Sequence, residues 1–152
     1  MDSLELAVPP PIVMLATALI MWLLSVFLPE LTLPGVGSLL AIVLGAIGVG
    51  ISMAGIIAFH RAHTTPDPRR PGAATTLVTS GVYRISRNPM YLGIQLALIA
   101  WGIFLGNVAA LLSAFLFAFY IQRLQIKPEE RFLQEKFGAE FTAYRAKVRA
   151  WL

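Results

Sequence analysis

Long runs without a charged side chain constrain the fold of this chain more than any other feature of its sequence. Asp, Glu, Lys and Arg are absent from residues 6–29, 31–60 and 88–122. A helix needs about 20 mostly apolar residues to cross about 30 Å of hydrocarbon, so the first two runs each hold one helix. The third run holds two shorter helices that form a hairpin with its turn at Gly106-Asn107. The pattern therefore predicts an all-α membrane protein with four transmembrane helices, near residues 10–28, 36–58, 90–105 and 108–125.

The positions of the basic residues predict how these helices are oriented. All twelve Lys and Arg residues lie in two segments, Arg61–Arg87 and Arg123–Arg149. Because basic segments stay on the cytoplasmic side of a membrane, we expect a cytoplasmic loop at residues 60–88 and a cytoplasmic helical tail at residues 127–152. Two helices precede each basic segment, so the N-terminus is expected in the cytoplasm as well. Residues 1–152 are predicted to form a single membrane domain.

The composition excludes several classes of function. Only 13% of the residues are charged, against about a quarter in soluble domains, so the +4 net charge reflects topology and anionic lipid headgroups rather than a nucleic-acid partner. The absence of cysteine excludes disulfides, thiolate catalysis and cysteine metal sites. His60 and His63 have few carboxylates nearby, so no metal site is expected. Four glycines of the second predicted helix are expected to allow close helix packing: Gly45, Gly48, Gly50 and Gly55.

Polar side chains gather where the third predicted helix begins and the fourth ends. Because an antiparallel hairpin brings these two ends together, we expect one cytoplasmic mouth with charges of both signs. Such a mouth suits a zwitterionic ligand, while a hydrophobic co-substrate arrives sideways from the lipid. The residues that line it are expected to be Tyr83, Arg84, Arg87, Asn88, Tyr91, Glu129 and Glu130.

The same residues also have purely structural explanations. Arg84 and Arg87 are typical of cytoplasmic anchors to lipid headgroups. Pro128 is expected to open a helix, and the acidic pair Glu129-Glu130 then interacts favourably with the helix dipole. Beyond it, an apolar stripe broken near Gly138 is typical of an amphipathic helix lying on the membrane or on the spans. The stripe consists of Leu133, Phe137, Phe141, Tyr144 and Val148.

Two motifs of this chain are similar to those of a known family. The segment Arg87-Asn88-Pro89-Met90-Tyr91-Leu92-Gly93 resembles the Arg-His-Pro-x-Tyr-x-Gly signature of integral-membrane methyltransferases. These are the isoprenylcysteine carboxyl methyltransferases and the phospholipid methyltransferases. The chain also has residues similar to a second signature of this family. They are Glu129-Glu130, Leu133, Phe137-Gly138, Phe141 and Tyr144. The resemblance covers residues 64–152, and it departs at Asn88, which stands where most members have a histidine and cannot titrate near neutral pH.

The resemblance implies S-adenosylmethionine as the methyl donor. It implies Arg87 as the catalytic residue that contacts the methyl acceptor, with Lys147 as a second substrate-binding residue. The residues that it implies at the cofactor are Tyr83, Asn88, Pro89, Tyr91, Gly93, Glu129 and Glu130.

We therefore expect S-adenosylmethionine-dependent methyl transfer at the cytoplasmic face of a membrane, with the bacterial inner membrane as the expected location. The expected acceptor is hydrophobic or lipid-embedded and carries a carboxylate of the isoprenylcysteine type. A carboxylate is already ionised at pH 7 and needs no base, whereas the alternative acceptors, a phospholipid amine or a small thiol, need one. A non-catalytic transport or assembly protein is the alternative class, but a transporter more often has polar residues inside its spans.

Overall fold

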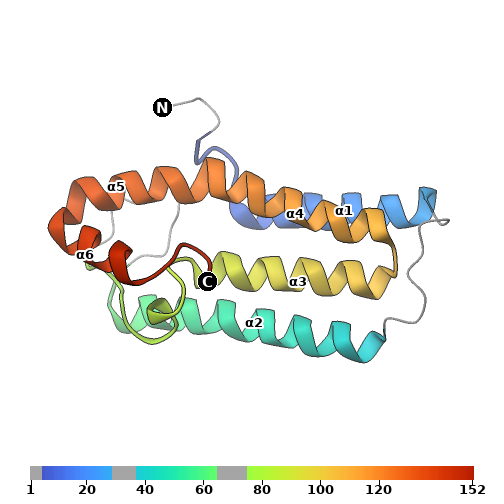
Figure 1. Ribbon diagram of the computed structural model, residues 1–152, viewed down its shortest axis with the longest axis horizontal. Helices are drawn as coiled ribbons and strands as arrows, with labels where there is room; N and C mark the ends of the chain where they lie inside the picture. Colours follow the sequence, from blue (N-terminus) through green and yellow to red (C-terminus); the bar gives the residue numbers. More distant parts are fainter. Residues whose placement is uncertain (1–4, 29–36, 65–74) are drawn as a thin grey trace.

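The computed structural model describes residues 5–28, 37–64 and 75–152, and within these ranges it is built from helices (Figure 1). Six α-helices follow one another along the chain, and a 3-10 turn, η3, and a π turn, η4, lie between them. The elements are α1 (Pro10–Phe27), α2 (Ser38–Arg61), η3 (Gly81–Arg84), α3 (Pro89–Leu105), α4 (Val108–Ile121), η4 (Gln122–Ile126), α5 (Lys127–Phe137) and α6 (Ala139–Lys147).

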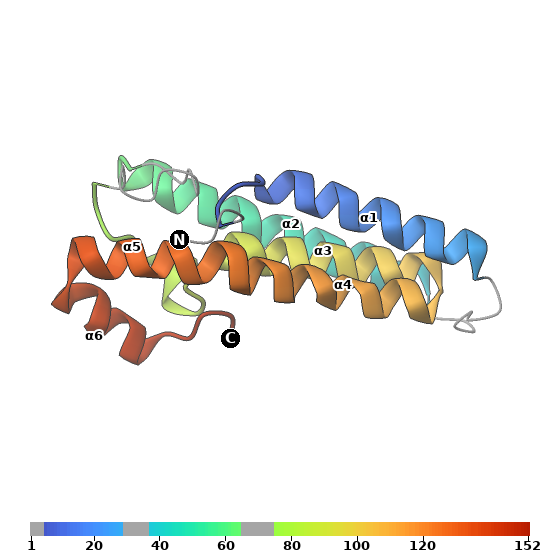
Figure 2. The ribbon, with the colours of Figure 1, turned by 90° about the horizontal axis from the view of Figure 1, so that it is seen from above.

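The first four α-helices lie side by side in a bundle (Figures 1 and 2). Helix α3 packs between α2 and α4, and α1 packs more extensively against α4 than against α3. Helix α5 continues α4 beyond the end of the bundle, and α6 turns back towards the start of α3. This arrangement confirms the expected all-helical architecture and places the polar tail beside the loop that precedes α3.

Three helices are long and apolar enough to cross a membrane, which makes this an integral membrane protein. They are α1, α2 and the continuous helix Val108–Phe137, while α3 is apolar but has only 17 residues. The turn between α3 and α4 lies where the sequence predicts it. Gly106 has a positive φ of 62°, and the side chain of Asn107 caps α4 by accepting a hydrogen bond from the N–H of Ala110 at 3.0 Å.

The helix that contains the fourth predicted span continues beyond residue 125, because α4, η4 and α5 form one uninterrupted helix to Phe137. Pro128 lies in the first turn of α5, as the sequence predicts, but α5 continues α4 without a break. A proline lacks the N–H that would bond the carbonyl four residues earlier, and its ring crowds that carbonyl. Here the π turn η4 widens the helix just ahead of Pro128, and the carbonyl of Leu124 accepts the N–H of Leu6 at 3.0 Å.

The tail helices α5 and α6 meet at Gly138, whose positive φ of 49° ends α5, in agreement with the predicted break in the apolar stripe. Phe141 is only 1% exposed and Val148 is buried, so the apolar face of α6 packs against the protein itself. The expected alternative, a tail helix lying on the membrane, therefore does not describe α6.

Close contact between α2 and α3 depends on small residues, as the glycines of the second span predict. A Cβ atom on Gly48 would lie 2.5 Å from the carbonyl oxygen of Gly93, and a Cβ atom on Gly93 would lie 2.8 Å from the N atom of Ser52. Such distances are shorter than any real carbon contact, so the two backbones approach as closely as they do only because both residues are glycine. Gly50 differs, because a Cβ atom there meets nothing within 4 Å.

This packing predicts a sharp difference between two glycine-to-alanine variants. Gly93→Ala should lower the melting temperature in detergent, because an overpacked interface costs about 1–3 kcal/mol. Gly50→Ala, the matched control, should leave the melting temperature unchanged or raise it slightly, because alanine favours the helix over glycine. Equal melting temperatures for the two variants would contradict the observed contact between α2 and α3.

Candidate functional site

The predicted polar residues lie at the end of the bundle where α3 begins and α4 passes into α5. Asn88 has non-helical backbone angles (φ −129°, ψ 55°), as expected for a residue before proline, and Pro89 is buried in the first turn of α3. The antiparallel arrangement of α3 and α4 then brings this turn next to the first turn of α5, as the hairpin predicts. The C-terminal segment returns to the same place (Figures 1 and 2).

A hydrogen bond from Tyr91 to Glu129 joins the two helices at this mouth. The Tyr91 hydroxyl donates to Oε1 of Glu129 at 2.6 Å, and Tyr91 is only 7% exposed. Burial raises the pKa of the Glu129 carboxyl to about 8, the hydrogen bond from Tyr91 partly opposes this rise, and the nearby charge of Glu130 adds to it. A carboxylate in such a place is poorly solvated and gains most from a cationic ligand.

Tyr83 forms a second wall of the mouth. Its ring is 4% exposed and packs edge-to-face on Phe59, with the ring centroids 5.4 Å apart. Its backbone carbonyl accepts the hydroxyl of Tyr144 at 2.6 Å, which attaches α6 to η3. Burial raises the pKa of the Tyr83 phenol, and the nearby Tyr144 and Glu129 raise it further. The hydroxyl of Tyr83 therefore stays protonated at neutral pH and can donate a hydrogen bond.

Arg87 and Glu130 form an ion pair, with 9% and 15% of their side chains exposed. Nε and Nη2 of Arg87 both donate to Oε1 of Glu130, at 3.0 and 2.5 Å. Nη1 donates to the carbonyl of Val148 and, at 3.4 Å, to that of Arg145. Most of the guanidinium donors are thus used inside the protein, and they link the loop before α3 to α5 and to the end of α6.

Residues 148–151, here named the C-terminal strap, lie between the start of α3 and η4. The side chains of Ser86 and Asn88 both donate to the carbonyl of Ala150, at 3.2 and 3.0 Å. The N–H of Arg87 donates to the carbonyl of Arg149 at 2.9 Å. At the other side, Nε1 of Trp151 donates to the Gln122 side chain at 2.7 Å.

Sequence patterns did not identify Ser86, Gln122 and Trp151, since the strap bonds mostly through backbone carbonyls. The one available signal was an isolated large aromatic residue at the end of a polar tail.

Two of the predicted site residues lie apart from this cluster. Gly93 faces α2, where close packing explains why it is a glycine. Lys147 is exposed at the end of α6.

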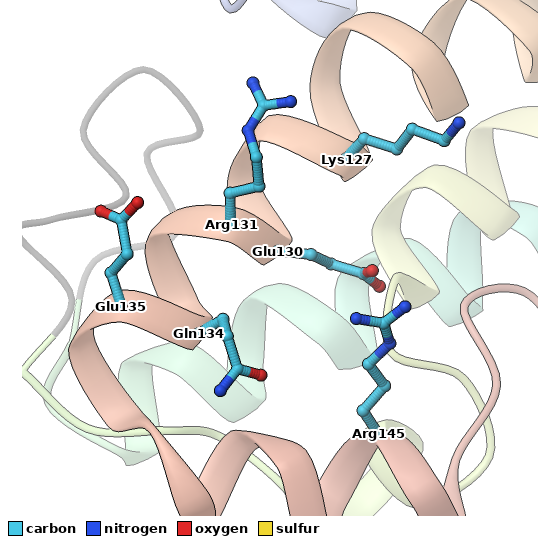
Figure 3. A pocket seen from close by; sticks show the side chains of 6 residues that line it. All are labelled: Lys127, Glu130, Arg131, Gln134, Glu135 and Arg145. Carbon is cyan, nitrogen blue, oxygen red and sulfur yellow. The ribbon is translucent and has the colours of Figure 1, made fainter.

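A cavity of about 430 Å³ adjoins the mouth between α5 and α6 (Figure 3). The side chains of Glu130 and Arg145 point towards one another across it. Its walls carry charges of both signs, which suits a ligand with separate positive and negative groups. The lining residues are Lys127, Glu130, Arg131, Gln134, Glu135 and Arg145.

The fold and this site define a helical membrane protein with a buried carboxyl–tyrosine cluster at one end of its bundle. The phospholipid methyltransferase family matches residues 36–140, which is more than half of the chain. A protein of Haemophilus influenzae described as uncharacterized is 46% identical over 63 residues, which are 41% of this chain and the whole of that protein. No solved structure matches the chain. The chain belongs to the phospholipid methyltransferase family and is an S-adenosylmethionine-dependent methyltransferase.

The chemistry of the mouth fits this cofactor. S-adenosylmethionine carries a sulfonium and an ammonium group, and the mouth offers the carboxyl groups of Glu129 and Glu130 with neutral tyrosine hydroxyls around them. The poorly solvated Glu129 is the group that gains most from such a cation, because burial opposes its charge when it is alone.

Proposed function

We propose that this protein transfers a methyl group from S-adenosylmethionine to the amino headgroup of a membrane lipid. One observation carries the proposal: the buried carboxyl of Glu129, held by Tyr91, faces a mouth whose nearby arginine is already paired. A mouth of this kind attracts cations more than anions. Both the methyl donor and a lipid ammonium group are cations, whereas a carboxylate acceptor is not.

On the donor side, we propose that Glu129 and Glu130 bind the positive groups of S-adenosylmethionine and that Tyr83, Asn88 and Tyr91 complete the binding site. When bound, the cofactor supplies an electrophilic methyl group, and transfer leaves the C–S electron pair on sulfur. Pro89 fixes the start of α3 and so the direction of Tyr91. Asn88, which replaces the family histidine, contributes an amide that holds the C-terminal strap and does no acid–base work.

On the acceptor side, a lipid amine must lose a proton before its nitrogen can form the new N–C bond. That proton leaves to solvent, so the fraction of amine that can attack rises with pH. Arg87 then acts mainly by holding Glu130 and the carbonyl of Val148 in place. The main contribution to catalysis is the positioning of two substrates in a water-poor mouth.

A carboxylate acceptor of the isoprenylcysteine type is the second candidate. Arg87 already holds a carboxylate, that of Glu130, so an anionic acceptor that displaces Glu130 would find a guanidinium fork of the right geometry. Lys147 would then supply a second positive charge. The pH profile of the reaction separates the two candidates.

We also propose that all four helices α1 to α4 span the membrane, with both termini and the mouth in the cytoplasm. The positive-inside distribution of the basic residues supports this orientation. The 17 residues of α3 extend about 26 Å, which is slightly less than the thickness of the hydrocarbon core of a bilayer. Local thinning of the bilayer around α3 accommodates this difference. A bacterial relative supports the inner membrane as the location.

Cysteine labelling tests this topology, because the natural chain contains no cysteine. Single cysteines at Gly37, Thr76 and Ala139, which are exposed positions, should be challenged with a membrane-impermeant thiol reagent in intact cells. Only Gly37→Cys should react from outside, and the other two should react only after the cells are opened. External labelling of Thr76→Cys would place the mouth on the wrong side of the membrane and contradict the topology.

Calorimetry tests the proposed donor site. Glu129→Gln and Glu130→Gln should each weaken S-adenosylmethionine binding about ten- to a hundredfold, because each loses a charge-assisted hydrogen bond worth about 1.5–3 kcal/mol. Wild-type affinity should rise from pH 6 to pH 8, since binding of a cation requires the ionised form of Glu129, and this rise should vanish in Glu129→Gln. Glu140→Gln, an exposed control, should bind normally. Normal binding by the double variant would leave the acidic pair with only a helix-start role.

The acceptor is tested by methyl transfer from radiolabelled S-adenosylmethionine to phosphatidylethanolamine in nanodiscs. At saturating donor, the initial rate should increase from pH 6.5 to pH 8.5, because deprotonation of the amine precedes attack. Methylated phosphatidylethanolamine should be the labelled product. A flat pH profile with label only on a prenylated carboxylate would contradict the amine acceptor and support the second candidate.

A further inference from the structure

Gln95 has an unusual position in the interior of the bundle. Its side chain is on α3, the residue is only 7% exposed, and neither Nε2 nor Oε1 has a hydrogen-bond partner. Within the described part of the chain, no other buried side chain leaves two polar atoms unpaired. Gln125, the nearest comparison, bonds the carbonyl of Val8 through its Nε2 at 2.8 Å. An unpaired amide inside an apolar bundle is costly, so it indicates a partner that the chain itself does not supply.

The position of Gln95 follows from helix geometry. It lies two residues after Gly93, which faces α2, so it is on the opposite side of α3, towards α1 and α4. It falls between Tyr91 and Leu98, and both of these pack in the cluster that contains Ile121 of α4. Gln95 is four residues beyond Tyr91, which places its backbone about 6 Å deeper in the bundle than the mouth.

We propose that Gln95 hydrogen-bonds an acyl carbonyl of the lipid acceptor and so selects lipids whose chains are joined through an ester or amide. The inference rests on the proposed function and names a feature of the same acceptor. A lipid with its amino headgroup at Glu129 has its first carbonyl directly below the headgroup, on the bundle side of Tyr91. The Nε2–H group of Gln95 donates to that carbonyl oxygen, and a neutral amide needs no counter-charge there.

The packing of α1 determines what a lipid that enters from this side must displace. Helix α1 contacts α4 more extensively than α3, and at the boundary with α3 Nε1 of Trp101 donates to the carbonyl of Ala18 at 3.1 Å. The face of α1 away from the bundle carries exposed apolar side chains, among them Ile12, Leu15 and Leu19. A lipid chain that reaches the amide between α1 and α3 must therefore open this hydrogen bond.

Lipids that differ only in their linkage test the inference. Wild-type protein should be assayed in nanodiscs with diester phosphatidylethanolamine, its diether analogue, which lacks both carbonyls, and ceramide phosphoethanolamine, which has an amide. The wild type should show a KM about three- to tenfold lower for the diester than for the diether, the effect of one hydrogen bond. If the KM for the ceramide lipid is also low, the protein recognises both ester and amide carbonyls. If that KM is high, the protein recognises ester carbonyls only.

The variant Gln95→Met should raise the KM for the diester to the diether value. It should leave S-adenosylmethionine affinity and the diether rate unchanged. Its melting temperature should equal or exceed that of the wild type, because two unpaired polar atoms are removed. The matched control Gln125→Met should lower the melting temperature, because it loses the bond to Val8, and should keep the diester preference.

Three results would overturn the inference. If the wild type treats diester and diether alike, or if Gln95→Met keeps the diester preference, the amide has no role towards the acceptor. Loss of the diester preference in Gln125→Met to the same extent as in Gln95→Met shows that the preference is not specific to Gln95. If the wild-type protein methylates none of these amino lipids, the proposed acceptor and the inference are both wrong. Normal binding of S-adenosylmethionine in that case shows that the proposed donor site still stands.

Discussion

The hydrogen bond from Tyr91 to Glu129 joins the first turn of α3 to the first turn of α5 and keeps a carboxyl group out of water. Burial raises the pKa of this carboxyl to about 8. A cation that enters the mouth favours the ionised carboxylate and so offsets the cost of its burial. The proposed chemistry depends on this one group, because its ionised form recognises the positively charged donor. The antiparallel hairpin of α3 and α4 is what places its two partners within reach.

The tail completes the mouth through bonds to backbone carbonyls. Arg87 links Glu130 to the carbonyl of Val148, while Ser86 and Asn88 bond the carbonyl of Ala150. The mouth therefore forms only when the loop before α3 and the end of the chain come together. An asparagine in place of the family histidine fits this arrangement, because an amide holds a carbonyl at any pH whereas an imidazole would also titrate.

The hairpin and the meeting of its ends could be predicted from sequence, because charge-free runs fix the helices and an antiparallel turn fixes their neighbours. The strap could not, since its acceptors are backbone carbonyls far from their donors in sequence and no side-chain pattern encodes them. Pro128 lies in the first turn of α5 as expected, but the sequence did not reveal that the π turn η4 joins this helix to α4 without a break. Gly93 shows the limit of motif reasoning, because its fit against α2 has a sufficient explanation in packing alone.

The central claim is that the donor binds at the mouth between the start of α3 and the tail. Hydrogen–deuterium exchange of the protein in nanodiscs, with and without S-adenosylhomocysteine, tests it most directly because it locates the ligand without relying on any variant or acceptor. The account predicts slower exchange in peptides that cover residues 81–92 and 127–151, and no change along α1. Protection confined to other segments, or none at a saturating ligand concentration, would contradict it.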